Sequence, residues 1–280
     1  MPTCTKAIIP VAGYGTRRLP ITKSIEKCML SLGNRPVIDY IVRDCAAAGI
    51  TDIYFVVSGP AMQLRSYYER DMALEKILEQ KGKTDLLADI TPPESLTFHF
   101  VEQDLSDGRY GNTIPVWLCR DYIAEDELFM VIMGDDITYV KAGKSDIERL
   151  VELGAPAILG VPVHEGKDIS RYGVIANDEH GIMTTIVEKP APGTEPTRLI
   201  NPSKYVFPGV FMRHANQSMQ GEPGPLGEYL LTDPLNALIA DGAKLQVVEA
   251  HGTYLDTGTV ETWTWANAWL FNVHREQEKA

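Results

Sequence analysis

The chain has 280 residues, of which 44% are hydrophobic and 23% are charged, and its formal net charge at pH 7 is −12. This length allows one large α/β domain with a sizeable core, and the composition is that of a soluble globular protein. So acidic a chain argues against a broad nucleic-acid-binding surface, although one cationic loop is enough to hold a small anionic ligand.

The first predicted element is a strand over residues 7–11, because this run is apolar and β-branched and suits a strand buried on both faces of a sheet. Gly13 and Gly15 follow, and without a Cβ they allow backbone N–H groups to approach a phosphate closely. Thr16 adds a hydroxyl donor. Four cations then come within fifteen residues of Gly13, namely Arg17, Arg18, Lys23 and Lys27. This local positive charge indicates an anion-binding loop.

The spacing of this loop differs from two familiar phosphate loops. A Walker A loop needs Gly-x-x-x-x-Gly-Lys-Ser/Thr, and a dinucleotide fingerprint needs a third glycine that opens a helix. A Gly-x-Gly pair alone favours an ordinary strand-to-helix turn with a solvated basic face. The whole string over residues 6–30, however, resembles the Gly-x-Gly-Thr-Arg-x-x-Pro-x-Thr-Lys signature of sugar-phosphate nucleotidylyltransferases. It is most similar to the bacterial-type UTP:glucose-1-phosphate uridylyltransferases.

The next elements form a predicted strand-helix-strand unit. Pro36 suits the first turn of a helix that Gly49 can end, and residues 53–57 form a second apolar strand. Residues 61–93 are charged and largely helical. They predict either a solvated excursion from the sheet or a subunit contact, and an insertion of this kind resembles that of the uridylyltransferases.

Two later strands, over residues 96–103 and 128–133, lead into polar loops at the sheet edge where open α/β sheets bind ligands. The side-chain amide of Gln103 both donates and accepts, so it can pair with a pyrimidine. The resemblance implies that Gln103 and Gly108 bind the uracil, although residues 109–113 depart from the family's usual Gly-x-Gly-His-Ala. A helix with Pro115 near its first turn follows this loop.

The second of these strands ends in Gly134-Asp135-Asp136, a short motif in which Asp135 alone would be a turn or capping residue. The expected partner of Asp135 is Asp256, in a Leu-Asp-Thr-Gly-Thr string that follows another strand. Two carboxylates from distant strands would hold one Mg²⁺, which keeps several waters and takes its other ligands from phosphate oxygens.

From residue 157 the predicted strands become short, at residues 157–163, 172–175, 184–187, 205–211 and 245–249. Tyr-Gly-Val around Gly173 and Val-Glu-Lys-Pro around Glu188 resemble the sugar-binding strings of the family. The resemblance implies that Gly173 lets the backbone contact the hexose, that Glu188 accepts hydrogen bonds from its hydroxyls, and that Lys189 neutralises its phosphate. Lys204 stands before Tyr-Val where the family commonly has arginine, and is expected in the same sugar site. Taken alone, Glu188-Lys189 would be a surface pair.

The resemblance implies a Rossmann-like three-layer α/β/α nucleotidyltransferase fold with a mixed, mainly parallel sheet. Residues 1–280 would form one domain, in which residues 1–155 bind the nucleotide and residues 156–280 bind the sugar phosphate and end in a helix over 260–278. The implied reaction is attack by glucose 1-phosphate on the α-phosphorus of UTP, with Mg²⁺ as cofactor and no general base, since a sugar phosphate is already mostly dianionic. The implied nucleotide site comprises Ala12, Gly13, Gly15, Thr16, Arg17, Lys23, Gln103 and Gly108, and the implied catalytic residues are Arg17, Lys27, Asp135 and Lys189.

Two alternatives remain open at the level of sequence. The Leu-Asp-Thr-Gly-Thr string resembles the thymidylyltransferase branch, which would use dTTP. Glu26 stands beside Lys27 where active relatives usually have proline, so its carboxylate either points to solvent or weakens the phosphate site, as in a catalytically silent regulatory homologue. The resemblance and the apolar, aromatic tail favour a homodimer or homotetramer, although Trp265 and Trp269 would by default pack in the core.

The cysteines are far apart and show no zinc-ligand spacing, so we expect reduced thiols. No apolar run approaches the ~18 residues that span a bilayer. We therefore expect a cytoplasmic protein that is neither exported nor inserted in a membrane.

Overall fold

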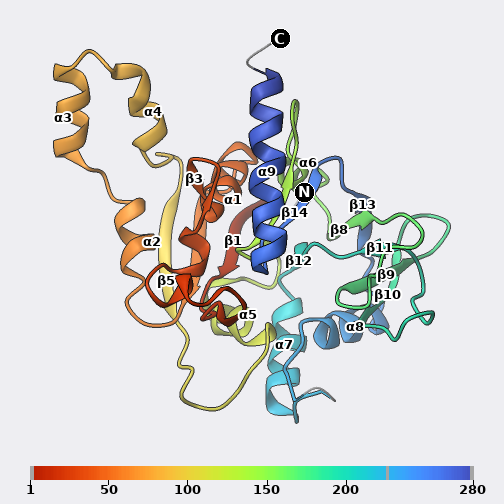
Figure 1. Cartoon of the computed structure of the whole chain (residues 1–280). Helices are drawn as coiled ribbons and strands as arrows, with labels where there is room; N and C mark the ends of the chain where they lie inside the picture. The colour runs from red at the N-terminus through yellow and green to blue at the C-terminus, as the bar shows by residue number, and fades with distance from the viewer. Residues whose placement is uncertain (1–2, 225–226, 278–280) are drawn as a thin grey trace.

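The computed structural model describes residues 3–224 and 227–277, which fold around one ten-stranded mixed sheet (Figure 1). Its strands are β1 (Cys4–Pro10), β4 (Asp52–Val57), β5 (Thr97–Glu102), β6 (Leu128–Ile132), β8 (Ala157–Pro162), β9 (Gly173–Asn177), β10 (Met183–Glu188), β11 (Leu199–Ile200), β12 (Lys204–Pro208) and β13 (Gln246–Glu249). Their order is β10-β9-β11-β8-β12-β6-β1-β4-β5, and β13 also pairs with β8. The sheet therefore takes strands from both halves of the chain.

Four neighbouring strands, β5, β4, β1 and β6, run parallel to one another, and β13 runs parallel to β8. Every antiparallel pairing within the sheet involves strands of the second half, beginning with β12, which runs antiparallel to both β6 and β8. Parallel strands end at the same edge, so the loops that follow β1 and β6 lie next to each other. Outside this sheet, β14 (Thr253–Asp256) pairs with β7 (Asp136–Tyr139), and β2 (Ser31–Leu32) pairs with β3 (Arg35–Pro36).

Helices cover both faces of the sheet, and β1 shows why. Ala7 and Ile9 pack into one cluster with α1 (Val37–Ala47), α6 (Asp146–Glu152) and α9 (Val260–Gln277), whereas Ile8 packs into a second cluster. That second cluster includes α5 (Thr113–Leu118), α7 (Phe211–Gln220) and α8 (Thr232–Ala240). The expected α/β/α fold with a mixed sheet is therefore confirmed, as is the prediction that the first strand is buried on both faces.

The excursion predicted over residues 61–93 consists of α2 (Met62–Tyr67), α3 (Met72–Gln80) and α4 (Leu87–Ile90). Figure 1 shows α3 and α4 projecting from the rest of the molecule. Short 3₁₀ turns complete the inventory: η1 (Thr16–Arg18), η2 (Ile21–Lys23), η3 (Lys27–Met29), η4 (Thr84–Leu86) and η5 (Arg120–Tyr122). Within the described residues, no helix combines the length and apolar character needed to cross a bilayer.

Two predictions for the second half were wrong. The strand expected over 205–211 ends at Pro208, and Phe211 opens α7 instead. Between them, Gly209 lies against the backbone of Ala124, where a Cβ would come within 1.8 Å of the carbonyl oxygen. Trp265 is 52% exposed rather than packed in the core, although Trp269 does pack against it. The tail helix otherwise matches the prediction, except that residue 278 lies outside the described residues. The four cysteines are buried free thiols, as expected.

Candidate active site

The loop after β1 is folded back on itself around Gly15. Gly15 has φ 63°, and a Cβ there would lie 3.0 Å from Thr22 Cγ2 and 3.2 Å from Lys27 Cβ. The Thr22 hydroxyl donates to the Gly15 carbonyl at 2.9 Å. Both the left-handed backbone and the close approach require glycine, and together they bring Lys27 back beside the start of the loop.

Lys27 joins this loop to the end of β6. Its ammonium donates to Asp135 Oδ2 in an ion pair whose side chains are each 21% exposed. Gly134 makes the approach possible, because a Cβ there would lie 2.6 Å from Val11 Cγ1. Burial alone raises the pKa of Asp135, but the charges of Lys27, Arg18 and Arg17 bring that pKa below its ordinary value. Asp135 is therefore ionised and already surrounded by cations.

The β14–β7 ribbon brings a second acidic segment to the same place. Asp256 pairs with Asp136 in the strand register, and the next residue, Thr257, donates to the Asp135 carbonyl through its hydroxyl at 2.7 Å and its N–H at 3.3 Å. The Asp256 carboxylate accepts from the Gly258 N–H at 2.7 Å and from Arg171 Nη2 at 3.1 Å. The structure thus brings Asp135 and Asp256 together although they are far apart in sequence.

These acids line one cavity of about 180 Å³, which we call the aspartate cavity. Its lining residues are Arg17, Asn112, Asp135, Asp136, Arg171, Tyr172, Gly173, Glu188, Asn201, Ser203, Tyr205, Thr232, Tyr254, Asp256 and Gly258. Burial and the charge of Asp135 raise the pKa of Asp136 to about 7, and the Tyr254 hydroxyl donates to Asp136 at 2.5 Å. Burial is the larger of these two causes, and the charge of Asp135 adds to it.

The side chains in the aspartate cavity limit which cation could bind there. No group of three or more His, Cys, Asp or Glu side chains in residues 3–224 and 227–277 forms a metal site by itself. Asp135 and Asp256 offer two carboxylates facing one cavity. They fit Mg²⁺ because that ion keeps waters and takes phosphate oxygens for its remaining positions.

The predicted hexose residues Gly173 and Glu188 lie in the aspartate cavity as a cross-strand pair. A Cβ on Gly173 would lie 3.1 Å from Glu188 Oε2, so the glycine leaves the carboxylate room. Burial raises the pKa of Glu188, and the nearby Lys189 charge partly offsets this. Polar carboxyl and backbone groups therefore face the space between the second-half strands and the aspartates.

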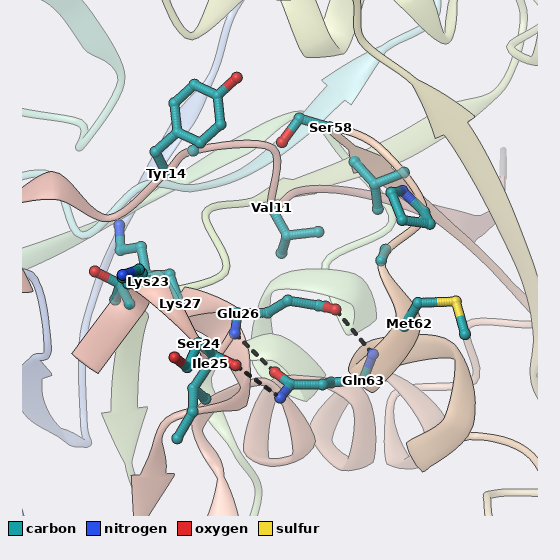
Figure 2. A pocket seen from close by; sticks show the side chains of 15 residues that line it. Val11, Tyr14, Lys23, Ser24, Ile25, Glu26, Lys27, Ser58, Met62 and Gln63 are labelled. Atoms are coloured by element: carbon teal, nitrogen blue, oxygen red, sulfur yellow. Dashed lines mark hydrogen bonds between the residues drawn. The ribbon is translucent and has the colours of Figure 1, made fainter. Parts of the chain in front are cut away.

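A second cavity, of about 430 Å³, lies on the other side of Lys27, and we call it the loop pocket (Figure 2). Gly13, Lys23 and Lys27 line it, whereas Ala12 is buried and its carbonyl accepts from the Ser58 hydroxyl at 2.7 Å. Thr16 and Arg17 form the 3₁₀ turn η1, and Arg17 lines the aspartate cavity. Gly13 and Lys23 thus share the loop pocket with Lys27, and Gly15 lies against Lys27.

Gln103, Gly108 and Lys189 are among the expected residues that line neither cavity. Gln103 directly follows β5 and its N–H donates to the Val57 carbonyl at 2.8 Å, while Gly108 lies exposed in the loop beyond. Lys189 is exposed and follows Glu188. Its φ is 45°, and its N–H donates to the Tyr172 carbonyl at 3.1 Å.

The expectation that Lys204 binds sugar is wrong. Its side chain is 1% exposed, and its ammonium donates to the Asp136 carbonyl at 2.6 Å. Neighbouring residues of a strand point to opposite faces, so Tyr205 lines the aspartate cavity and Lys204 faces away from it. Burial lowers the pKa of Lys204, and the charges of Asp136 and Asp44 raise it by a smaller amount. Lys204 supports the acidic strand from behind.

Glu26 lines the loop pocket, but its carboxylate is bound by backbone N–H groups of α2. Its carboxylate accepts from the N–H groups of Gln63 at 2.8 Å and Leu64 at 3.2 Å, at the start of α2. In return, the Glu26 N–H donates to Gln63 Oε1 at 2.8 Å. Figure 2 shows the Glu26 side chain extending toward Gln63 and away from Lys23 and Lys27. Glu26 therefore anchors the loop to α2.

Two residues of the site were not predicted from the sequence. Arg18 was expected only to add positive charge to the loop, and no role was expected for Asp136. The Arg18 side chain is buried, with Nη1 donating to the Lys27 carbonyl at 3.3 Å and Nη2 to the Thr257 hydroxyl at 3.1 Å. It ties the cationic loop to the segment that carries Asp256. The signal for Asp136 was its place in Gly-Asp-Asp, whereas no local pattern announces a contact between residues 18 and 257.

Comparison with known proteins agrees with this geometry. A family profile described as "Nucleotidyl transferase" matches residues 6–271. The chain belongs to this nucleotidyl transferase family. The UTP--glucose-1-phosphate uridylyltransferase of Bacillus subtilis (strain 168) is 36% identical over 242 residues, which cover 83% of this chain and 80% of that protein. A relative with the same activity name from Staphylococcus saprophyticus, numbered 1, is 36% identical over 83% of this chain and 81% of its own length.

Among solved structures, a UTP-bound UGPase from Acinetobacter baumannii superimposes with a TM-score of 0.81 at 30% identity, covering 96% of this chain and 93% of that one. This nucleotidyl transferase therefore shares its fold over nearly its whole length with a UTP-bound UGPase. The resemblance drawn from its motifs is confirmed.

Proposed function

We propose that the chain transfers the uridylyl group of UTP to glucose 1-phosphate, which gives UDP-glucose and pyrophosphate. The observation that carries this proposal is the Lys27–Asp135 pair, because it joins the cationic loop pocket to the aspartate cavity. Substrates bound in the two cavities would meet at this pair. The names of the relatives support UTP and glucose 1-phosphate as those substrates.

The reaction places two anions next to each other. The attacking phosphate, with a second pKa of ~6, is mostly dianionic at neutral pH and needs no general base. Catalysis then consists of holding the attacking oxygen in line with the α-phosphorus and neutralising the charge that develops. Arg17 and the N–H groups of Gly13 and Gly15 would hold the β- and γ-phosphates, with Thr16 and Lys23 beside them. Lys27 would contact the α-phosphate.

The second half would position the acceptor. Glu188 would accept hydrogen bonds from the glucose hydroxyls, and Gly173 opposite it would let the backbone approach the ring. Lys189 follows Glu188 directly, and its long exposed side chain would reach the sugar phosphate. We also propose that Gln103 and Gly108, after β5, bind the uracil. On this assignment residues 1–155 hold the nucleotide and residues 156–280 hold the sugar phosphate.

Asp135 and Asp256 would hold a Mg²⁺ ion, which when bound neutralises phosphate charge and orients the attack. Arg18 and Lys204 would fix these two acidic segments from behind, through Thr257 and the Asp136 carbonyl. From the resemblance we further propose a cytoplasmic homodimer or homotetramer, which size-exclusion chromatography with light scattering would test.

The test is a pyrophosphate-release assay with UTP, glucose 1-phosphate and Mg²⁺. We expect turnover with UTP to exceed that with dTTP at least tenfold. Preference for dTTP would replace the proposal with a thymidylyltransferase, and absence of release with either nucleotide would favour the regulatory homologue. Asp135→Asn serves as the inactive control.

A further inference from the structure

Arg171 lies in the aspartate cavity but has no part in the reaction proposed above. Its Nη2 donates to the Tyr172 hydroxyl at 2.6 Å and to Asp256 Oδ2 at 3.1 Å. Its guanidinium carbon lies 4.9 Å from the centre of the Tyr172 ring. A cation is therefore paired with one of the two carboxylates that fit a metal ion.

The oxygen that Arg171 contacts is the one a metal would need. Asp256 Oδ1 accepts from the Gly258 N–H at 2.7 Å, so Oδ2 is left for the cavity. Arg171 and the Tyr172 hydroxyl, at 3.4 Å, both approach Oδ2. A divalent cation on Oδ2 would repel a guanidinium at hydrogen-bond distance, so the two cations compete.

The two acidic groups differ in how firmly their cations are held. Lys27 is 21% exposed and is fixed against Gly15, whereas the Arg171 side chain is 51% exposed. Arg171 can leave Asp256 without breaking a packed loop. Its stacking on Tyr172 keeps the Arg171 side chain at the cavity, which Gly173 and its cross-strand partner Glu188 also line.

We propose that Arg171 binds the phosphate of the acceptor sugar and is held on Asp256 until a divalent cation displaces it. This assignment rests on the proposed function for the identity of the acceptor. A guanidinium is planar and matches two phosphate oxygens at once, which suits the role better than a second lysine. Metal binding then releases the residue that binds the sugar phosphate, so each ligand strengthens the binding of the other by the same factor.

The test compares wild type, Arg171→Met and Arg171→Lys, with Arg213→Met as the control. Arg213 also pairs with a carboxylate, Glu125, but lies on α7 outside the aspartate cavity. Mn²⁺ binding is measured by electron paramagnetic resonance with and without glucose 1-phosphate, and KM and kcat are measured by pyrophosphate release.

We expect Arg171→Met without substrate to bind Mn²⁺ at least threefold more tightly than wild type. KM for glucose 1-phosphate should rise at least tenfold, with kcat and KM for UTP changing less than threefold. Glucose 1-phosphate should tighten Mn²⁺ binding in wild type but not in Arg171→Met, and Arg171→Lys should lie between the two. Arg213→Met should match wild type throughout.

Unchanged or weaker Mn²⁺ binding by Arg171→Met would overturn the competition, and an unchanged KM for glucose 1-phosphate would overturn the phosphate contact. If wild type released no pyrophosphate from UTP and glucose 1-phosphate, the proposed function would fail instead. The Mn²⁺ comparison between wild type and Arg171→Met would still decide whether Arg171 and the metal compete.

Discussion

Replacing Glu26 by alanine separates two opposite interpretations of the carboxylate beside Lys27. The structure makes it an anchor, since its two oxygens accept from the N–H groups of Gln63 and Leu64 at 2.8 and 3.2 Å. Glu26→Ala leaves those two donors at the start of α2 without their acceptor. Loss of a capping side chain of this kind costs about 1–2 kcal/mol.

This free-energy loss predicts a shift that can be measured. For domains approaching the size of this chain, ~1 kcal/mol corresponds to about 2–4 °C in Tm, so Glu26→Ala should unfold about 2–8 °C below wild type. Since Lys27 follows directly, KM for UTP should also rise, by up to about tenfold if ~1.4 kcal/mol of its contact is lost. Differential scanning fluorimetry and pyrophosphate release measure the two effects.

Glu26→Gln is the matched control because it keeps one oxygen acceptor, and it should lose less than half as much Tm. If Glu26 instead weakened the phosphate site, its removal would raise kcat/KM and leave Tm unchanged. That pair of results would refute the anchoring role.

Three further predictions concern two charged residues of the proposed site, the metal, and the buried carboxyl group of Asp44. Asp135→Asn and Lys189→Ala should each lower kcat by roughly 10²–10³-fold in the pyrophosphate assay, with Tm near that of wild type for the exposed Lys189; near-normal rates would contradict either role. Chelation by EDTA should abolish pyrophosphate release and added Mg²⁺ should restore it, whereas full activity in EDTA would remove the metal from the account. Burial raises the pKa of Asp44 from 3.8 to about 7, so between these values the native state keeps a proton that the unfolded state has lost, and wild-type stability falls as pH rises. Asp44→Asn should remove that part of the fall between about pH 5 and pH 7.5; an unchanged Tm difference would show that Asp44 does not titrate there.

The parts of the site that the sequence predicted are those whose geometry is local. Gly15 and Lys27 belong to one short loop, and Asp135 directly follows a buried strand. Parallel strands end at one sheet edge, so the motifs after β1 and β6 had to be neighbours. These rules were sufficient to place the cationic loop beside Asp135.

Contacts between distant segments could not be predicted in this way. The Arg18–Thr257 hydrogen bond joins residues 239 positions apart, and nothing local to Arg18 separates a buried guanidinium from a solvated one. The expectation that Lys204 binds sugar was wrong for a related reason. Alternation along β12 says that Lys204 and Tyr205 face opposite sides, but only the packed helices show which side holds the cavity.

The proposed mechanism requires Asp135 and Asp256 to share one divalent cation. An electron paramagnetic resonance titration with Mn²⁺ in the presence of UTP, on wild type, Asp135→Asn and Asp256→Asn, tests this directly. We predict one Mn²⁺ per chain in wild type and at least tenfold weaker binding in both variants. Wild-type Mn²⁺ affinity in either variant would contradict the shared site.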